Sequence, residues 1–139
     1  MKQLSCLDLF CGCGGFSLGM LRAGFSVLAA VDFNAEAIAV FRRNFPEVRT
    51  VLEADLTKFQ PQELAALVDV TTVDVIVGGP PCQGFSIVRQ RDGSNSGLRI
   101  VEDVRRYLYR EFLGYVRFFQ PKVFVMQKPG RILEALNRL

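Results

Sequence analysis

The chain has 139 residues, of which 50% are hydrophobic and 22% charged, and its formal net charge is +3. This length supports one hydrophobic core, so residues 1–139 are expected to form a single domain and not two. The sequence shows no apolar run of about 18 residues, no leader and no lipidation motif, which predicts a soluble protein of the cytoplasm (nucleoid-associated) or of the nucleus, without membrane contact.

Apolar runs and helical patterns alternate along the chain. Strands are predicted at residues 4–10, 26–31, 49–52, 73–77 and 122–126, and helices at 16–23, 35–44, 61–68, about 103–119 and 131–139. This alternation is typical of parallel strands joined by crossover helices. Right-handed crossovers then predict an α/β fold with an open, mostly parallel sheet, helices on both faces and the strand order 3-2-1-4-5.

A glycine-rich turn follows the first predicted strand, at residues 10–15, and lets the backbone approach a ligand closely. The dinucleotide pattern G-x-G-x-x-G is broken, because Ser17 stands where its third glycine belongs, and this weakens a NAD interpretation. Asp32 lies 20 residues after Gly12, at the end of the second strand, and can accept hydrogen bonds from both hydroxyls of a ribose. The two features together predict an adenosine-containing cofactor, although Asp32 alone would also fit an ordinary turn acid.

The fourth strand delivers a cysteine onto a stiff turn. The β-branched run 75–77 is typical of a strand covered on both faces, and the glycine pair 78–79 is expected to let the backbone turn before two prolines fix the φ angles. Cys82 therefore follows the carboxyl end of a strand, where open α/β sheets place their ligands. Most lone cysteines are small buried hydrophobic residues, but the polar neighbours Gln83 and Ser86 argue against burial here.

The spacing of the four cysteines does not predict a further functional site. Cys6, Cys11, Cys13 and Cys82 show no Cys-x-x-Cys spacing and the chain has no histidine, so reduced thiols are expected, without a metal site or a disulfide framework.

A basic segment follows Cys82. Six arginines and three acids lie between Arg89 and Arg110. The irregular stretch 84–102 is expected to be mobile, because nothing in it can bury a continuous apolar face. A solvated loop would explain this charge by itself, and a net charge of +3 is too small to prove nucleic-acid binding. The position beside Cys82 favours a loop that closes on a phosphate backbone.

Four segments, in this order, resemble the motifs of the DNA cytosine-5 methyltransferase family. They are residues 8–17 (DLFCGCGGFS), 31–33 (VDF), 79–86 (GPPCQGFS) and 108–112 (LYREF), and they extend over nearly the whole chain. The resemblance implies a Rossmann-like, S-adenosylmethionine-dependent methyltransferase fold whose C-terminal part is missing. It also implies DNA methylation of the restriction-modification type, with DNA as the partner of the complete enzyme.

The resemblance selects S-adenosylmethionine as cofactor, with S-adenosylhomocysteine as its product. It implies that the amino acid moiety lies beside Phe10 and the three glycines Gly12, Gly14 and Gly15. It places the ribose on Asp32, the adenine beside Phe33 and the adenine amino group on Asp55. Further pocket positions correspond to Leu56, Pro80 and Leu108. Asp55 could equally begin an Asx turn, and Phe33 and Leu56 could be ordinary core residues.

In the mechanism that the resemblance implies, Cys82 adds covalently to carbon 6 of cytosine, carbon 5 takes the methyl group, and loss of the carbon 5 proton releases the enzyme. The base must first leave the duplex stack, and the loop after Cys82 closes over it. The residues expected to contact nucleic acid are Ser86, Arg89, Arg91 and Arg105.

The chain departs from the family after the fifth strand. Gln127, followed by Lys128, stands where the family has a glutamate that contacts cytosine N3. A glutamine can hydrogen-bond the base but cannot deliver a proton at neutral pH, and loss of a proton-transfer group typically reduces the rate by about two to four orders of magnitude. We therefore expect the chain to be inactive or weak alone.

Several functions fit these observations. The preferred one is the cofactor-binding part of a DNA cytosine-5 methyltransferase. The alternatives are a catalytically degenerate S-adenosylmethionine-binding protein, one subunit of a split methyltransferase, and a tRNA cytosine-5 methyltransferase. A NAD-dependent dehydrogenase is disfavoured by Ser17 and leaves Cys82 without a role. Because the strand at 122–126 would form an exposed sheet edge, a complementing subunit or self-association is expected.

Overall fold

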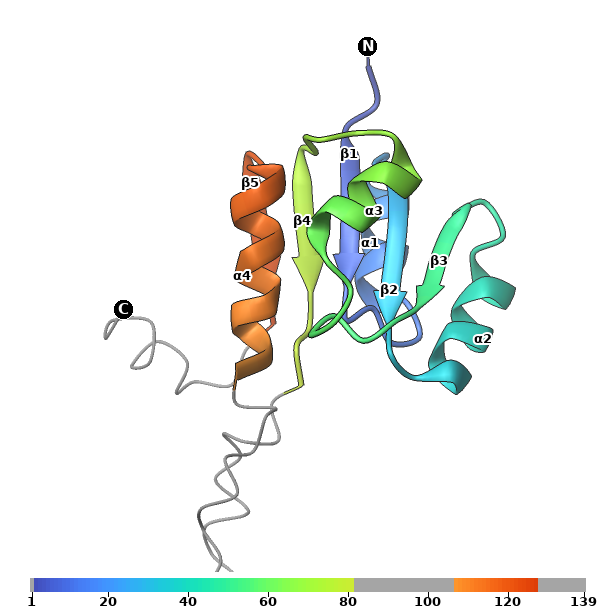
Figure 1. Cartoon of the computed structure of the whole chain (residues 1–139). Helices are drawn as coiled ribbons and strands as arrows, with labels where there is room; N and C mark the ends of the chain where they lie inside the picture. The colour runs from blue at the N-terminus through green and yellow to red at the C-terminus, as the bar shows by residue number, and fades with distance from the viewer. Residues whose placement is uncertain (1, 82–106, 128–139) are drawn as a thin grey trace, which may run out of the picture.

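The computed structural model describes residues 2–81 and 107–127 of the chain (Figure 1). Three predictions lie outside these residues: the mobile stretch 84–102, the beginning of the fourth helix and the final helix at 131–139. Cys82, Ser86, Arg89, Arg91, Arg105 and Lys128 also lie outside them.

Nine helices and strands alternate along the described residues. They are β1 (Ser5–Leu9), α1 (Gly15–Arg22), β2 (Ser26–Asp32), α2 (Ala35–Asn44), β3 (Thr50–Glu53), α3 (Pro61–Val68), β4 (Val75–Gly78), α4 (Leu108–Phe119) and β5 (Val123–Met126). All strand pairs are parallel, and the sheet order is β3-β2-β1-β4-β5. The predicted fold class and strand order are confirmed. None of the described helices is long and apolar enough to span a membrane.

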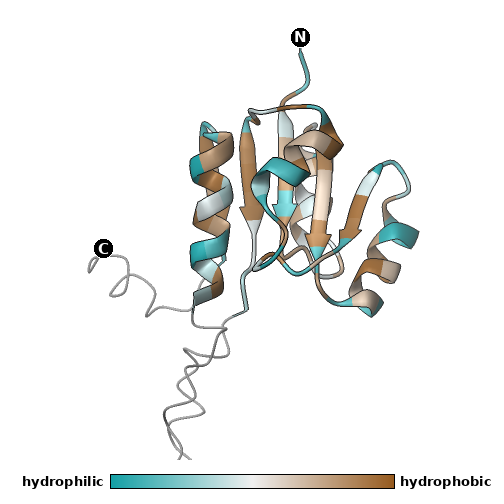
Figure 2. Ribbon diagram, viewed as in Figure 1, coloured by the Kyte–Doolittle hydropathy of each residue, from teal (hydrophilic) through white to brown (hydrophobic). Residues whose placement is uncertain are grey.

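Helices cover both faces of the sheet, because alternate strand residues point to opposite sides. On one face, Leu7 of β1 packs with Leu64 of α3 and Phe112 of α4. On the other, Val77 of β4 packs with Phe41 of α2 and partly buried residues of α1. Figure 1 shows α3 and α4 in front of the sheet and α1 behind it. In Figure 2 the strands are coloured mainly as hydrophobic, as expected for a sheet buried between two helical layers.

The amino ends of three strands are joined by one carboxylate. Asp74, just before β4, accepts hydrogen bonds from the Ser5 backbone N–H at 2.8 Å and from the Ser5 hydroxyl at 3.0 Å. Its other oxygen lies 2.7 Å from Nζ of Lys122, just before β5. The Lys122 side chain and these hydrogen bonds lower the pKa of Asp74 to about 2. The opposite, carboxyl ends of the strands carry the predicted site.

β5 forms one end of the described sheet. It pairs with β4, and its residues remain accessible: Val123 is 55%, Phe124 46% and Val125 45% exposed. The Phe124 ring lies 6.1 Å from that of Phe112 in α4, whereas the two valines point to the opposite face. Within the described residues, the predicted exposed edge is present.

Gly78 serves a different purpose from the one predicted. A sharp turn was expected at residues 78–79, but Gly78 is the last residue of β4 and its φ is not positive. A Cβ at this position would collide with the carbonyl oxygen of Leu9 and stand 2.9 Å from the Phe112 ring. Glycine is needed here because β4 approaches β1 closely, with α4 packed over the contact.

Candidate functional site

The loop after β1 has an unusual backbone. Phe10, Gly12 and Gly14 have φ angles of 56°, 53° and 100°, so three of its residues adopt left-handed conformations. For a phenylalanine this conformation is strained by about 1 kcal/mol or more, and strain of this kind persists where the surroundings fix the backbone. The Cys11 N–H donates to the Val31 carbonyl at 3.1 Å, which ties the loop to β2. The loop therefore has a shape that is set before any ligand arrives.

The glycines of this loop have different roles. A Cβ on Gly14 would collide with the Phe45 ring and stand 2.9 Å from the Phe41 ring, so α2 and the residue after it require a glycine there. Gly15 has no positive φ, and a Cβ there would meet no atom within 4 Å. Gly12 also faces open space. Gly15 thus has no packing reason to be glycine among the described residues, and a closely approaching ligand would supply one.

Asp32, the last residue of β2, is 9% exposed and joins the loop to this strand. One carboxylate oxygen accepts a 2.9 Å hydrogen bond from the Gly12 N–H, and the other accepts one of 2.9 Å from the Asn34 N–H. Each oxygen keeps a further lone pair that could accept from a ligand hydroxyl.

The aromatic residue beside Asp32 is accessible. Phe33 is 64% exposed, so the alternative that it is a core residue does not hold. Leu56, by contrast, is 3% exposed and belongs to the core on the α3 and α4 face. An exposed ring next to a strand-end acid suits the stacking of a flat heterocycle.

Asp55 forms the Asx turn that was weighed as its alternative. One of its oxygens accepts from the Thr57 N–H at 2.9 Å and from the Thr57 hydroxyl at 2.7 Å, and these bonds lower its pKa. The other oxygen lies 4.0 Å from Nζ of Lys58. The turn engages one carboxylate oxygen, so the other can still accept a hydrogen bond from a ligand.

A cavity of about 460 Å³ brings the loop after β1 together with the end of β5. Its lining residues are Phe10, Cys11, Gly12, Gly15, Phe16, Gly79 and Gln127. The Gln127 N–H donates to the Gly78 carbonyl at 2.9 Å, which fixes the backbone at the end of β5. Four predicted residues, Phe10, Gly12, Gly15 and Gln127, thus meet in one cavity. Asp32 contacts its wall through Gly12, whereas the lining does not include Phe33, Asp55, Leu56, Pro80 or Leu108.

A buried acid beneath the loop received no role in the sequence analysis. Asp8, the residue before the last of β1, is fully buried and accepts hydrogen bonds from the Ser17 hydroxyl at 2.6 Å and from the Ser17 N–H at 3.1 Å. Burial raises its pKa to about 6, while the bonds from Ser17 act in the opposite direction. The sequence signal that could have identified Asp8 is a charged residue within the apolar run of the first strand. Ser17, which breaks the dinucleotide pattern, is thus the hydrogen-bond partner of the Asp8 side chain in β1.

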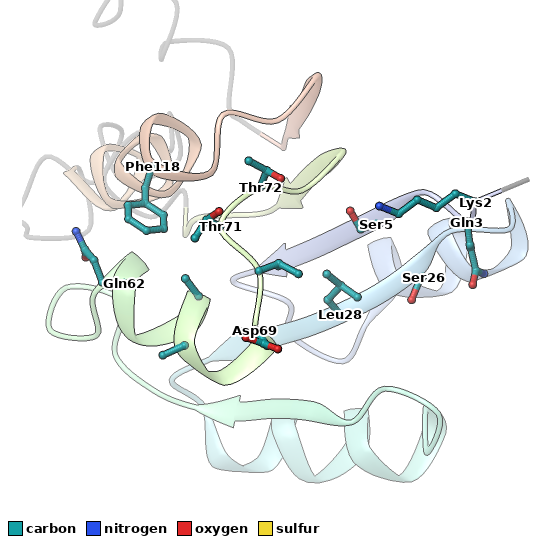
Figure 3. A pocket seen from close by; sticks show the side chains of 13 residues that line it. Lys2, Gln3, Ser5, Ser26, Leu28, Gln62, Asp69, Thr71, Thr72 and Phe118 are labelled. Carbon is teal, nitrogen blue, oxygen red and sulfur yellow. The ribbon is translucent and has the colours of Figure 1, made fainter.

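A second groove lies elsewhere in the described part of the chain. It measures about 860 Å³ and is found beside the amino ends of β1 and β2, α3 and the segment after it (Figure 3). Lys2, Gln3, Ser5, Ser26, Gln62, Asp69, Thr71 and Thr72 supply its polar lining, with Leu28 and Phe118 among the apolar residues. None of the predicted site residues lines it. The residues that line this groove give no reason to place catalysis there.

Metal ligands are not clustered in the described part of the chain. Within residues 2–81 and 107–127, no group of three or more His, Cys, Asp or Glu residues could hold a metal ion. Burial raises the pKa of the Cys6 thiol to about 12 and also raises that of the Cys11 thiol, so burial disfavours the thiolate form of both.

Comparison with known proteins places these features in context. The family model described as C-5 cytosine-specific DNA methylase matches residues 4–133. The type II methyltransferase M1.HphI of Haemophilus parahaemolyticus is 41% identical over 130 residues, which cover 94% of this chain and 33% of that protein. Among solved structures, a candidate DNA modification methyltransferase encoded within a prophage (E. coli) matches with a TM-score of 0.77 and 33% identity, over 98% of this chain and 35% of that one.

A DNMT2 variant from Spodoptera frugiperda matches with a TM-score of 0.66 and 26% identity, over 98% of this chain and 38% of that one. The chain therefore spans about a third of the length of these relatives.

Proposed function

The chain belongs to the C-5 cytosine-specific DNA methylase family, and on this premise we propose that it is the cofactor-binding part of a DNA cytosine-5 methyltransferase. The observation that carries the proposal is the loop after β1: its open glycines line a cavity together with Gln127, and the strand-end acid Asp32 holds the loop through Gly12. In open α/β sheets, ligands bind at this end of the strands.

S-adenosylmethionine is the methyl donor of this family, and the described residues fit it. Gly12 and Gly15 leave open space at the cavity wall, where the amino acid moiety would lie beside Phe10. Asp32 keeps acceptor capacity for the ribose hydroxyls, and the exposed ring of Phe33 is available to the adenine. The remaining proposed pocket residues are Asp55, Leu56, Pro80 and Leu108, while Gly14 supports the loop by packing against α2.

Cys82 is proposed as the nucleophile. When bound, S-adenosylmethionine supplies an electrophilic methyl group. The Cys82 thiolate would form a bond to carbon 6 of cytosine, and the electron pair of the 5,6 double bond would make carbon 5 nucleophilic. Carbon 5 would then bond to the methyl group as the bond between that methyl group and sulfur breaks, leaving S-adenosylhomocysteine. A base then removes the carbon 5 proton, the sulfur–carbon 6 bond breaks, and the 5,6 double bond and the thiolate are regenerated. Buried Pro80 lies two residues before this cysteine and is separated from the end of β4 by Gly79.

Gln127 makes slow turnover or none the expected outcome. Its carboxamide can donate to cytosine N3 and accept from the exocyclic amine, but it does not transfer a proton at neutral pH. This residue is the specific observation in favour of the second candidate, a degenerate S-adenosylmethionine-binding protein. Replacing Gln127 by Glu should therefore raise methyl transfer if the first candidate is correct and should leave it absent if the second is.

A complementing chain is proposed to cover β5. The accessible apolar side chains of Val123, Phe124 and Val125 lie on a strand that has β4 as its neighbour among the described residues. Exposed, uncharged strand edges pair readily with other strands. Either a subunit carrying further parts of the methylase or a second copy of this chain would satisfy this edge.

DNA is proposed as the substrate in preference to tRNA. The type II methyltransferase from Haemophilus parahaemolyticus is 41% identical to this chain, whereas the DNMT2 structure is 26% identical. In an organism such as this relative's, chromosomal DNA lies in the cytoplasm, which is accordingly the proposed location. Ser86, Arg89, Arg91 and Arg105 remain the proposed nucleic-acid contacts.

Calorimetric titration of the purified chain with S-adenosylmethionine and S-adenosylhomocysteine tests the proposal. Saturable binding of both would support it, and absence of binding would contradict a functional cofactor site in this chain. The covalent step is tested separately with duplex DNA containing 5-fluorocytosine, since fluorine cannot leave carbon 5 as a proton does. A denaturation-resistant protein–DNA complex that requires S-adenosylmethionine and is lost in Cys82→Ser would support the role of Cys82.

A further inference from the structure

The first turn of α1 is held by a side chain from another element. Its N-cap residue is Gly14, which has no side chain to accept a hydrogen bond. The acceptor is Asp8 of β1, bonded at 3.1 Å by the Ser17 N–H and at 2.6 Å by the Ser17 hydroxyl. A carboxylate at this position also interacts favourably with the positive end of the helix dipole. Asp8 thus performs from β1 the task that a side chain at the N-cap usually performs.

The other oxygen of Asp8 is unsatisfied. Oδ1 is the one buried side-chain oxygen or nitrogen in the described part of the chain without a hydrogen-bond partner. Cys6 and Cys11 contribute thiols nearby, Asp32 contributes a second carboxylate, and burial together with Asp32 raises the pKa of Asp8 to about 6. An apolar side chain would avoid this desolvation, so stability alone does not explain an aspartate at this position.

Its position relative to the cavity suggests the explanation. Four N–H groups at the start of a helix have no partner within the helix. In α1 these belong to the N-cap Gly14 and to the three residues after it: that of Ser17 is bonded to Asp8, and that of Gly14 is bonded to the Cys11 carbonyl at 3.0 Å. The other two belong to Gly15 and Phe16, which line the cavity. The hydrogen bonds from Ser17 to Asp8 therefore determine where these two N–H groups lie.

We infer that Asp8 is a positioning residue of the cofactor site: acting through Ser17, its ionised carboxylate holds the first turn of α1 where Gly15 and Phe16 meet S-adenosylmethionine. This inference rests on the proposed function. Asp32 holds Gly12, and Asp8 holds the helix end of the same loop, so the two acids fix it from β2 and β1.

The charge state of Asp8 gives the inference a distinctive consequence. Hydrogen bonds to an ionised carboxylate are stronger than those to the neutral acid. S-adenosylmethionine carries a net positive charge near neutral pH, and a nearby carboxylate favours it. Both effects predict that affinity falls as the pH is lowered through about 6, where Asp8 takes up a proton. The product S-adenosylhomocysteine lacks the sulfonium charge and has no net charge, so it should show a smaller change.

The experiment is calorimetric titration with S-adenosylmethionine between about pH 5 and 8 for the wild type, Asp8→Asn and Ser17→Ala. Ser17→Ala is included because it keeps the buried carboxylate and removes its strongest donor. Affinity should fall about tenfold in both variants at pH 7.5, as for loss of about one charge-assisted hydrogen bond, and Asp8→Asn should lose the pH dependence near 6. Ile38→Val, a small change in the core beneath α2 that leaves Asp8 and Ser17 intact, is the control for a general loss of stability.

A purely structural role would lower the unfolding temperature of Asp8→Asn and of Ile38→Val but leave the pH profile of binding unchanged. Asp8→Asn with wild-type affinity and wild-type pH dependence would overturn the inference and leave the proposed function intact. A wild-type chain that binds no S-adenosylmethionine would overturn both. Hydrogen exchange without ligand provides an independent reading: faster exchange of the Ser17 amide in Asp8→Asn is expected, and unchanged exchange would show that Asp8 does not hold α1.

Discussion

The N–H of Gly12 donates a 2.9 Å hydrogen bond to the carboxylate of Asp32, so the end of β2 holds the loop that leaves β1. Asp32→Ala removes this acceptor and the proposed ribose contact. Affinity for S-adenosylmethionine should fall by about ten- to a hundredfold, the range for loss of a hydrogen bond to a charged group. Cys82→Ala should bind within about twofold of the wild type, because its role is proposed for the base. Equal losses in the two variants, measured by calorimetry, would contradict this division of roles.

Gly14 and Gly15 form a matched pair of adjacent positions with opposite expectations. Gly14→Ala places a methyl group against the Phe45 and Phe41 rings at a φ of 100° and should lower the free energy of unfolding by about 2 kcal/mol or more. Gly15→Ala should leave stability unchanged or raise it by up to about 1 kcal/mol, because alanine favours helix more than glycine does. Urea unfolding measures both changes.

The Gly14→Ala and Gly15→Ala variants should also distinguish an effect on folding from an effect on cofactor binding. A methyl group on Gly15 would fill the open space at the cavity wall, so Gly15→Ala should weaken S-adenosylmethionine binding while the protein remains folded. Tight binding by Gly15→Ala would show that the ligand does not approach the backbone at this point.

Asp8 should make the protein less stable as the pH rises. Its folded-state pKa is raised from 3.8 to about 6, so the folded state retains a proton that the unfolded state has lost between these values. The free energy of unfolding should therefore fall by about 3 kcal/mol as the pH rises from about 4 to 6, at about 1.4 kcal/mol per pKa unit, and then level off. Asp8→Asn should remove this decline. Urea unfolding at several pH values tests it, and an unchanged slope in the variant would contradict the assignment.

Asp74 titrates in the opposite sense. Its pKa is lowered to about 2 by Lys122 and Ser5, so its stabilising contribution is complete above its ordinary pKa and is lost as the pH falls toward 2. Asp74→Ala should reduce this acid sensitivity below pH 4 without affecting the Asp8 transition. The two acids can therefore be distinguished in one unfolding series.

Charge at the edge strand should oppose association. Val125→Lys in β5 should shift the protein toward monomer in sedimentation experiments, because lysine on an edge strand disfavours strand pairing. Val40→Lys on α2 is the matched control, since Val40 is a similarly exposed valine, 43% against 45%, away from this edge. A wild-type chain that stays monomeric at all concentrations and finds no complementing partner would contradict the proposed pairing of β5.

The strand order could be predicted from the sequence because alternating strands and helices, with right-handed crossovers, leave few arrangements. The place of Asp32 at the end of the second strand could be predicted because its distance from Gly12 along the chain reflects a local β1-α1-β2 unit. Gly78 was misinterpreted because its reason lies in the carbonyl of Leu9, which is distant in sequence and adjacent only in the folded sheet.

At the site, the contact between Ser17 and Asp8 is another feature that local sequence did not predict. Ser17 was taken only as evidence against a dinucleotide pattern, whereas its hydroxyl is bonded to Asp8 across two elements. Asp55 was left open between ligand contact and Asx turn, and the turn formed with Thr57 is present. Local turn chemistry is encoded in neighbouring residues, but the pairing of buried polar groups depends on the tertiary structure.

The central position of β1 has a consequence for the order in which the protein folds. β1 is first in the chain, yet one of its edges pairs with β2 and the other with β4, and the Ser5–Asp74 hydrogen bond closes a separation of 69 residues. Contacts of such high sequence separation form slowly, whereas β1, β2 and β3 can pair through shorter closures. During synthesis, the three-stranded half therefore appears first, and the backbone edge of β1 that later pairs with β4 stays unpaired until β4 leaves the ribosome. That interval is when the nascent chain most needs protection from aggregation.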